Sequence, residues 1–178
     1  VNIIGIEKNK EYYSLAKKSL KLNKLESNIN FINKNFLSVT KSQTDIIVSN
    51  PPWFRKNSTY VSKNILLNEA KIESLDLTTW IKKVWENLSD KGEYYTIFPF
   101  NRIKELTGIL KKYFKVIKIY PLCSFKELPP NRAIIYAKKT AIKYQYLEFD
   151  KIIIHKADKT FMDNINDLLH KGISFPLT

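Results

Sequence analysis

Short apolar runs that alternate with amphipathic stretches constrain the fold of this chain more than any other feature. Runs typical of strands lie at 2–6, 30–32, 45–49, 94–98, 116–120 and 133–137. Apolar residues at helical spacing fill 12–23, 77–88 and 103–113. Strands that are apolar throughout and separated by helices are typical of a parallel sheet covered on both faces. We therefore expect an α/β fold with a mostly parallel sheet.

No helical segment separates the last two runs, which predicts a terminal antiparallel strand pair. Asp76 precedes the second helix and is expected to cap it, while Gly92 is expected to turn the chain into the strand at 94–98. The tail is less patterned, with a strand-like run at 152–154 and a weak helix near 162–169. The order of elements is thus predicted for most of the chain.

Composition limits the number of domains and the kinds of site. The chain has 178 residues, 44% of them hydrophobic, which is enough for one compact core, so we expect a single domain over 1–178, with about 140–178 as an extension of uncertain structure. No stretch reaches the ~20 apolar residues of a membrane helix. Cys123 is the single cysteine, and His155 and His170 are the two histidines, so we expect neither a disulfide nor a bound metal.

The charge balance points to a polyanionic partner. Lys and Arg number 30 against 17 Asp and Glu, a net charge of +13, which favours nucleic acid before a membrane surface. The same excess of Lys, Ile and Asn also arises from AT-rich coding without selection for binding. Composition alone leaves both readings open.

The sequence Asn50-Pro51-Pro52-Trp53 follows the run at 45–49 directly and carries the strongest chemical signal. Two prolines remove two backbone donors and stiffen the turn, which leaves carbonyl oxygens available as acceptors. The Asn50 side-chain oxygen and the Pro51 carbonyl oxygen would accept the two N–H groups of a planar amine, and Trp53 would stack on its ring. The alternative is a rigid turn at the end of a strand with a half-buried Trp.

Two further candidates also follow strands. Glu7 ends the first run, where an acid accepts hydrogen bonds from ribose hydroxyls in dinucleotide-type folds. Asn35 and Phe36 follow the second run, where a short polar side chain and a ring would contact an adenine. An ordinary helix-starting glutamate, and a loop amide beside a core Phe, are the competing interpretations.

In this order and spacing, Glu7, Asn35-Phe36 and Asn50-Pro-Pro-Trp53 resemble three motifs of the S-adenosylmethionine-dependent amino-methyltransferases of the Asn-Pro-Pro-aromatic type. Within that group the chain is most similar to the bacterial valine-tRNA adenine-N6 methyltransferases, which modify the adenine beside the anticodon. That likeness rests on further matches over about residues 2–139: Asn68-Glu69-Ala70, the segment from Gly92 to Pro99, Pro121-Leu122 and Asn131-Arg132.

The resemblance implies a Rossmann-like class I methyltransferase with S-adenosylmethionine as cofactor. Glu7 would bind the cofactor ribose, Asn35 and Phe36 its adenine, and Asn50 to Trp53 the target base. The methyl group would pass directly from cofactor to amine, which fits the absence of His or Cys near this turn.

The resemblance also implies an RNA partner, with tRNA first. The basic residues Arg55, Lys56 and Lys63 follow the turn and would contact phosphates, although such lysines also occur in solvated loops. The sequence has no secretory leader pattern, so we expect a cytoplasmic protein, and a monomer.

The sequence departs from the family pattern in two places. Four isolated glycines leave no room for a GxG loop, so we expect the first strand and the glycine-rich loop to be missing and the domain to be incomplete. Asn35 stands where many family members have Asp.

Other functions remain open at this stage. The same turn would hold guanine N2 of rRNA, a DNA adenine or a protein glutamine amide, since all are planar nitrogens. A chain without its cofactor loop would instead be a non-catalytic RNA-binding remnant.

Overall fold

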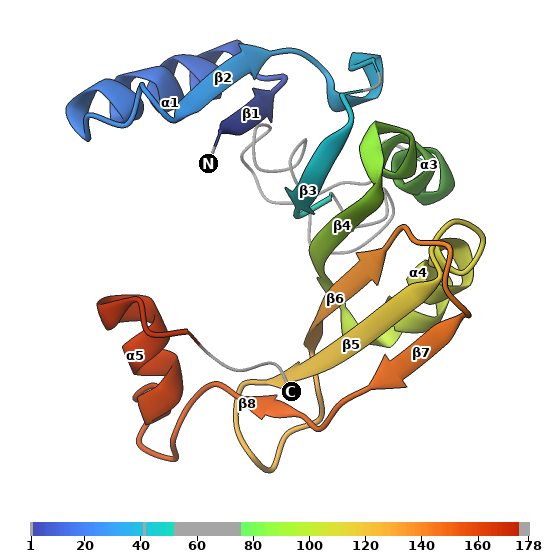
Figure 1. Ribbon diagram of the computed structural model, residues 1–178. Helices are drawn as coiled ribbons and strands as arrows, with labels where there is room; N and C mark the ends of the chain where they lie inside the picture. Colours follow the sequence, from blue (N-terminus) through green and yellow to red (C-terminus); the bar gives the residue numbers. More distant parts are fainter. Residues whose placement is uncertain (1, 41, 52–75, 175–178) are drawn as a thin grey trace. The chain divides into compact units, whose positions relative to one another are not determined.

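A computed structural model describes residues 2–40, 42–51 and 76–174. The chain divides into two compact units, an N-terminal unit of Val1–Ser42 and a C-terminal unit of Gln43–Thr178. Each unit is described by itself below. Figure 1 shows the elements of both.

The N-terminal unit is a strand–helix–strand unit. Strand β1 (Ile3–Glu7) pairs in parallel with β2 (Ile29–Asn33), and α1 (Lys10–Leu22) connects them. A short 3₁₀ helix, η1 (Phe36–Ser38), follows β2. Parallel strands need such a crossover, so the predicted alternation of strand and helix is confirmed here.

Two local features fix this unit. Asn9 caps α1, because its Oδ1 accepts hydrogen bonds from the backbone N–H groups of Glu11 (2.9 Å) and Tyr12 (3.1 Å). Gly5 lies opposite Phe31 in the pairing of β1 with β2, and a Cβ at Gly5 would lie 2.2 Å from Cε1 of the Phe31 ring. Only glycine leaves room for the ring in this position.

The C-terminal unit is built on a six-stranded sheet in the order β3-β4-β6-β5-β7, with β8 also paired to β5. Its strands are β3 (Thr44–Ser49), β4 (Leu88–Pro99), β5 (Val116–Cys123), β6 (Arg132–Lys138), β7 (Gln145–Glu148) and β8 (Ile152–Ile153). The helices are α3 (Leu77–Asn87), η2 (Phe100–Arg102), α4 (Ile103–Leu110) and α5 (Asp163–Lys171).

The pairing directions agree with the fold expected from the sequence. β3 runs parallel to β4, and β7 and β8 run parallel to β5, whereas β6 is antiparallel to both β4 and β5. The predicted terminal antiparallel pair, 116–120 with 133–137, is therefore confirmed.

The core of this unit lies on one face of the sheet. Buried side chains such as Tyr94, Phe98 and Ile135 alternate with half-exposed neighbours along β4 and β6. α3 and α4 lie on the same side of the sheet in Figure 1, and their apolar faces contribute Ile81 and Leu106 to the core. The inward-facing side chains of the strands, which recur at every second residue, pack against the apolar faces of the two helices in this layer.

The passage from α3 into β4 corrects one prediction. Asp76 caps α3 as expected, through Thr78 N–H (3.3 Å) and Thr79 N–H (3.0 Å). Gly92, however, is not a turn, because β4 already begins at Leu88 and continues through it. The register with β3 shifts between Thr44 and Ile46, so the extra residues of β4 are absorbed as an irregularity within the strand.

Candidate active site

Glu7 is the last residue of β1, at the carboxyl end of the parallel pair. Its Oε1 accepts a hydrogen bond from the backbone N–H of Asn9 (2.7 Å), which fixes the direction of the carboxylate. Asn33, the register partner of Glu7 on β2, donates from Nδ2 to the carbonyl oxygens of Glu7 (2.8 Å) and Lys8 (3.2 Å). The two strand ends are thereby tied together, and the acid is oriented by its own surroundings.

Asn35 and Phe36 lie at the same edge, directly after β2. Asn35 begins η1, and its Oδ1 accepts from the backbone N–H of Leu37 (3.0 Å), while its carbonyl oxygen accepts from Ser38 Oγ (2.7 Å). Asn35 is exposed and Phe36 is half-buried. Because β1 and β2 are parallel, the structure brings the ends that carry Glu7 and Asn35 to one edge of the sheet.

Asn50 and Pro51 follow β3 directly, at its carboxyl end. Asn50 is exposed and Pro51 is buried. The preceding residue is held from β4, because the hydroxyls of Ser49 and Tyr94 lie 2.8 Å apart. Tyr94 is fully buried and stacks on Phe114, with ring centroids 6.3 Å apart. The turn therefore begins from a fixed point.

The hydroxyl of Tyr94 acts as a neutral hydrogen-bonding group at this point. Burial raises the pKa of Tyr94 above its ordinary value, and this outweighs the opposing effect of the hydrogen bond with Ser49. The phenol stays protonated through the physiological range. It can therefore keep its bond to Ser49 without placing a charge behind the turn.

Several predicted site residues lie outside the described residues. They are Pro52 and Trp53 of the turn and the basic residues Arg55, Lys56 and Lys63. Glu7 and Asn35 belong to the N-terminal unit and Asn50 to the C-terminal unit, and each group is described within its own unit.

Asn33 and Tyr94 are the positioning residues that sequence reasoning missed. For Asn33 the sequence shows only an amide at the end of a strand, and its bridge to the end of β1 depends on the register of β2 against β1. For Tyr94 the alternation of side chains along the strand predicts only that it faces inward. Its pairing with Ser49, 45 residues earlier, depends on the register of β4 against β3.

A second polar cluster lies on the other face of the C-terminal sheet. Glu93 accepts hydrogen bonds from Lys138 Nζ (2.8 Å), the Tyr136 hydroxyl (3.0 Å) and the Tyr95 hydroxyl (3.1 Å). The hydrogen bond from Lys138 is the main cause that lowers the pKa of Glu93. The cluster borders a hollow of about 270 Å³. The residues that line this hollow are Glu93, Tyr95, Lys118, Tyr120, Ile134 and Tyr136. Within the C-terminal unit, this cluster does not include Ser49, Asn50 or Tyr94.

The residues at the ends of β1 and β2 suit a nucleoside better than a metal. They provide a carboxylate, an amide and a partly exposed ring, which is the chemistry that hydroxyls and a planar base need. Among the residues that the structure describes, no three His, Cys, Asp or Glu side chains gather as a metal site. Within the same residues, no helix has the length and apolar character needed to cross a membrane.

Each unit contains parallel strands with polar residues beyond their carboxyl ends, and the class of protein follows: the fold is that of the class I S-adenosylmethionine-dependent methyltransferases. More particularly, the chain belongs to the methyltransferase small domain family, whose profile matches residues 1–119. The predicted fold class is thus confirmed, and the family implies S-adenosylmethionine as the cofactor.

Curated relatives differ in their substrates. A release factor glutamine methyltransferase of Buchnera aphidicola is 29% identical over 147 residues, which cover 78% of this chain and 51% of the relative. A tRNA1(Val) (adenine(37)-N6)-methyltransferase of Haemophilus influenzae is 23% identical over 135 residues, 76% of this chain and 55% of the relative. The chain spans about half the length of the curated relatives it matches.

Solved structures agree on the fold. A predicted O-methyltransferase of Agrobacterium tumefaciens has a TM-score of 0.71 at 15% identity, covering 93% of this chain and 75% of that one. A tRNA methyltransferase, TrmI of Aquifex aeolicus, has a TM-score of 0.53 at 16% identity, covering 78% and 53%. At these identities the likeness concerns the fold alone.

Proposed function

We infer that this protein is an S-adenosylmethionine-dependent methyltransferase that acts on the exocyclic N6 amine of adenine in RNA. The observation that carries the proposal is the position of Asn50 and Pro51, directly beyond the carboxyl end of β3, behind which Ser49 is held by Tyr94. Membership of the methyltransferase small domain family supports the reaction class, and the tRNA-modifying relative supports the acceptor.

The cofactor would be held by the N-terminal unit. The carboxylate of Glu7, already oriented by Asn9 N–H, accepts from the two ribose hydroxyls. Asn35 uses Oδ1 to cap η1, which favours its amide N–H₂ as a donor to an adenine ring nitrogen, with Phe36 against the base. When bound, the cofactor supplies a methyl group on a sulfonium that needs no further activation.

The acceptor amine would be held by the turn after β3. The Asn50 side-chain oxygen and the Pro51 carbonyl oxygen accept its two N–H groups, which directs the nitrogen lone pair away from the turn. In this proposal Pro52 would stiffen the turn and Trp53 would stack on the base. Because a neutral amine is aligned and needs no strong base beforehand, these residues act by orientation.

The proposed substrate is valine tRNA, at the adenine next to the anticodon. The substrate in the name of the Haemophilus relative supports this choice, and the net charge of +13 suits a polyanionic acceptor. Arg55, Lys56 and Lys63 are proposed to contact tRNA phosphates beside the target base.

A second candidate acceptor is the side-chain amide of a protein glutamine. Two relatives, at 29% and 32% identity, are release factor glutamine methyltransferases. The same two acceptor oxygens would hold a primary amide. The excess of positive charge favours RNA over this alternative.

The test is a methylation assay in which two acceptors compete for the protein. Labelled S-adenosylmethionine is incubated with unmodified tRNA and with a glutamine-containing release-factor peptide, and the products are analysed by nucleoside and peptide mass spectrometry. We expect N6-methyladenosine in tRNA and no label in the peptide. Label in the peptide alone would contradict the RNA proposal.

Asn50→Ala is the matched variant. It should remove methyl transfer while leaving equilibrium binding of S-adenosylmethionine unchanged. Asn28→Ala, which removes an exposed amide at the opposite ends of β1 and β2, should leave both unchanged and serves as the control. Equal loss in the two variants would show that Asn50 has no special role.

A further inference from the structure

We propose that a row of lysines on α1, consisting of Lys10, Lys17 and Lys21 with Lys18 beside it, is a docking surface for the phosphodiester backbone of RNA. The proposal rests on the proposed function only for the identity of the polyanion. It assigns to the N-terminal unit a second task besides holding the cofactor.

Helical geometry aligns these lysines. With ~100° per residue, positions 10, 17 and 21 fall within about 40° of one another around the helix axis, and Lys18 lies next to them. At ~1.5 Å per residue the row extends for about 16 Å. All four side chains are exposed, and the helix begins to bury its surface at Leu20, about 60° beyond Lys17 around the axis. The row is therefore accessible along its length.

No lysine of the row forms an ion pair with a carboxylate of the described residues. In the C-terminal unit, lysines form ion pairs with carboxylates: Lys82, Lys83, Lys138, Lys139, Lys156 and Lys171. Within residues 2–40, by contrast, no described lysine lies within ion-pair distance of a carboxylate. The field of the row is thus directed to solvent and to whatever anion approaches.

The placement of Lys10 is not explained by helix stability. It is the first residue of α1, at the positive end of the helix dipole, where a cation is unfavourable. Lys8 adds a further exposed positive charge just before the helix. A positive charge that opposes the helix and has no acid partner is well suited to an external anion.

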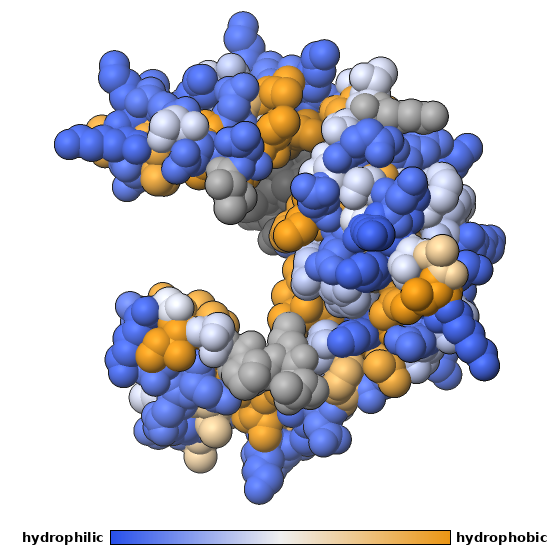
Figure 2. Space-filling model, viewed as in Figure 1, coloured by the Kyte–Doolittle hydropathy of each residue, from blue (hydrophilic) through white to orange (hydrophobic). Residues whose placement is uncertain are grey.

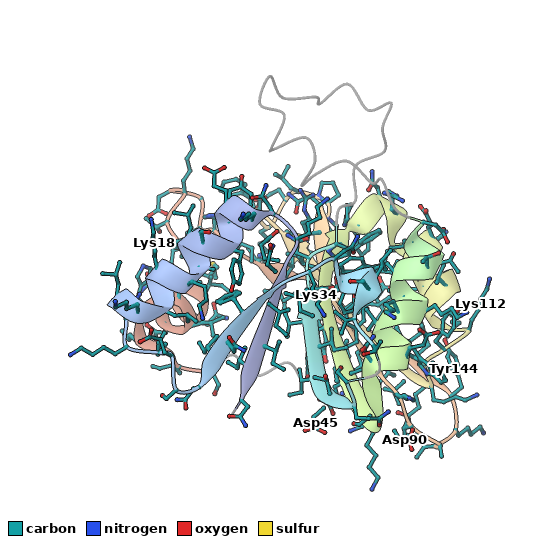
Figure 3. All side chains as sticks on the ribbon, turned by 90° about the horizontal axis from the view of Figure 1, so that it is seen from above. Lys18, Lys34, Asp45, Asp90, Lys112 and Tyr144 are labelled. Atoms are coloured by element: carbon teal, nitrogen blue, oxygen red, sulfur yellow. The ribbon has the colours of Figure 1, made fainter. Side chains whose placement is uncertain are left out.

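RNA fits this surface better than a membrane does. The row is narrow and is interrupted by Ser14, whose hydroxyl bonds to the Lys10 carbonyl oxygen. Figure 2 shows the α1 part of the visible face largely in the hydrophilic colour, and Figure 3 shows nitrogen-tipped side chains extending from α1, where Lys18 is labelled. A linear array of flexible ammonium groups matches a linear array of phosphates, and binding of this kind is strongly salt-dependent.

The experiment compares two variants with the same change of charge. The row variant carries K10Q, K17Q, K18Q and K21Q, since glutamine keeps a helix propensity close to that of lysine. The control variant carries K104Q, K112Q, K115Q and K143Q, four exposed lysines of the C-terminal unit (Lys112 is labelled in Figure 3). Binding of a labelled tRNA is measured by fluorescence anisotropy over a series of salt concentrations, without cofactor.

The row variant should bind at least about tenfold more weakly at low salt, and the slope of log K against log salt should fall by about 3, since four phosphate contacts contribute about 0.7–0.9 each. The control variant should lose less than about one unit of slope. Equal losses in both variants, or no loss in the row variant, would overturn the proposal. So would unchanged tRNA binding with a loss confined to anionic lipid vesicles.

Two checks separate failure of this proposal from failure of the proposed function. Lysine-to-arginine replacements in the row should restore binding, which a folding defect would not permit, and circular dichroism reports the fold directly. The assay requires no methyl transfer. If tRNA is never methylated but the row variant alone loses salt-dependent binding, the docking surface stands and the adenine-N6 reaction falls.

Discussion

The two units of this molecule are stabilised in different ways. The C-terminal unit buries large side chains between a six-stranded sheet and its helices, among them Tyr94, Phe98 and Phe114. In the N-terminal unit, Leu20 is the one buried hydrophobic side chain among the described residues. The C-terminal unit depends on apolar burial, and the N-terminal unit depends on caps and strand-end hydrogen bonds.

The difference teaches which unit is free to respond to ligands. A region with few buried apolar contacts opens locally at a lower free energy than a region with a core. The N-terminal unit, which carries Glu7, Asn35 and the lysine row, is therefore expected to gain order when a ligand binds. The C-terminal unit provides a frame that holds the turn after β3 whether or not a ligand is present.

The largest expected effect is on the core of the C-terminal unit. Phe98→Ala removes a fully buried ring and should lower the free energy of unfolding by ~3–5 kcal/mol, measured by guanidinium unfolding. Leu20→Ala should instead reduce amide-exchange protection in α1, with little change in the unfolding of the C-terminal unit. If Leu20→Ala shifted both transitions equally, the two units would be one cooperative structure.

Next in size is the effect of Glu7 on cofactor binding. Glu7→Gln keeps the shape but removes the charge that would accept two ribose hydroxyls, and charged hydrogen bonds are worth ~1.5–3 kcal/mol. Calorimetric titration with S-adenosylmethionine should show about a tenfold or greater loss of affinity. Glu26→Gln, an exposed acid between α1 and β2, is the control and should bind normally. Equal affinity in both variants would remove Glu7 from the site.

A smaller effect is expected at the contact that anchors the turn. Tyr94→Phe and Ser49→Ala each remove one partner of the 2.8 Å hydrogen bond and should destabilise the protein by ~0.5–1.5 kcal/mol. A double-mutant cycle measures the coupling between them. Both variants should reduce methyl transfer more than cofactor binding. Strictly additive stability changes, with full activity, would show that the bond does not position Asn50.

The smallest effect concerns acid stability. Because Lys138 lowers the pKa of Glu93, the ionised carboxylate stabilises the fold above its unfolded-state pKa, and this contribution is lost as pH falls through the lower folded-state pKa. The pair is partly exposed, so the contribution is at most about 1 kcal/mol. Between pH 6 and pH 3, the free energy of unfolding measured in urea should fall less steeply with decreasing pH for Glu93→Gln than for the unchanged chain. Parallel curves would contradict the ion pair.

The sequence was sufficient for most of the fold because hydrophobic period is a local property. It predicted the crossover of α1 and the antiparallel pairing of β5 with β6, since each depends on residues close in the chain. It did not predict β7, whose residues are exposed throughout and carry no apolar alternation. The pairing of β7 beside β5 is set by backbone hydrogen bonds, such as Gln145 N–H to Lys115 O at 2.7 Å.

The candidate site was predictable only in part for the same reason. Glu7, Asn35 and Asn50 stand out because polar residues end apolar strands. The residues that position them, Asn33 and Tyr94, act across strands, and such contacts depend on register. Register is a property of the assembled sheet, so a single sequence does not reveal it.

The edge position of β3 has a consequence for the behaviour of this protein in concentrated solution. Among the described residues β3 pairs with β4 alone, and Ile46 and Val48 on it are 55% and 75% exposed. An apolar edge strand of this kind is a template for strand addition between molecules, and the net charge of +13 opposes such contact by mutual repulsion. Salt that screens the charge is therefore expected to favour self-association of this protein.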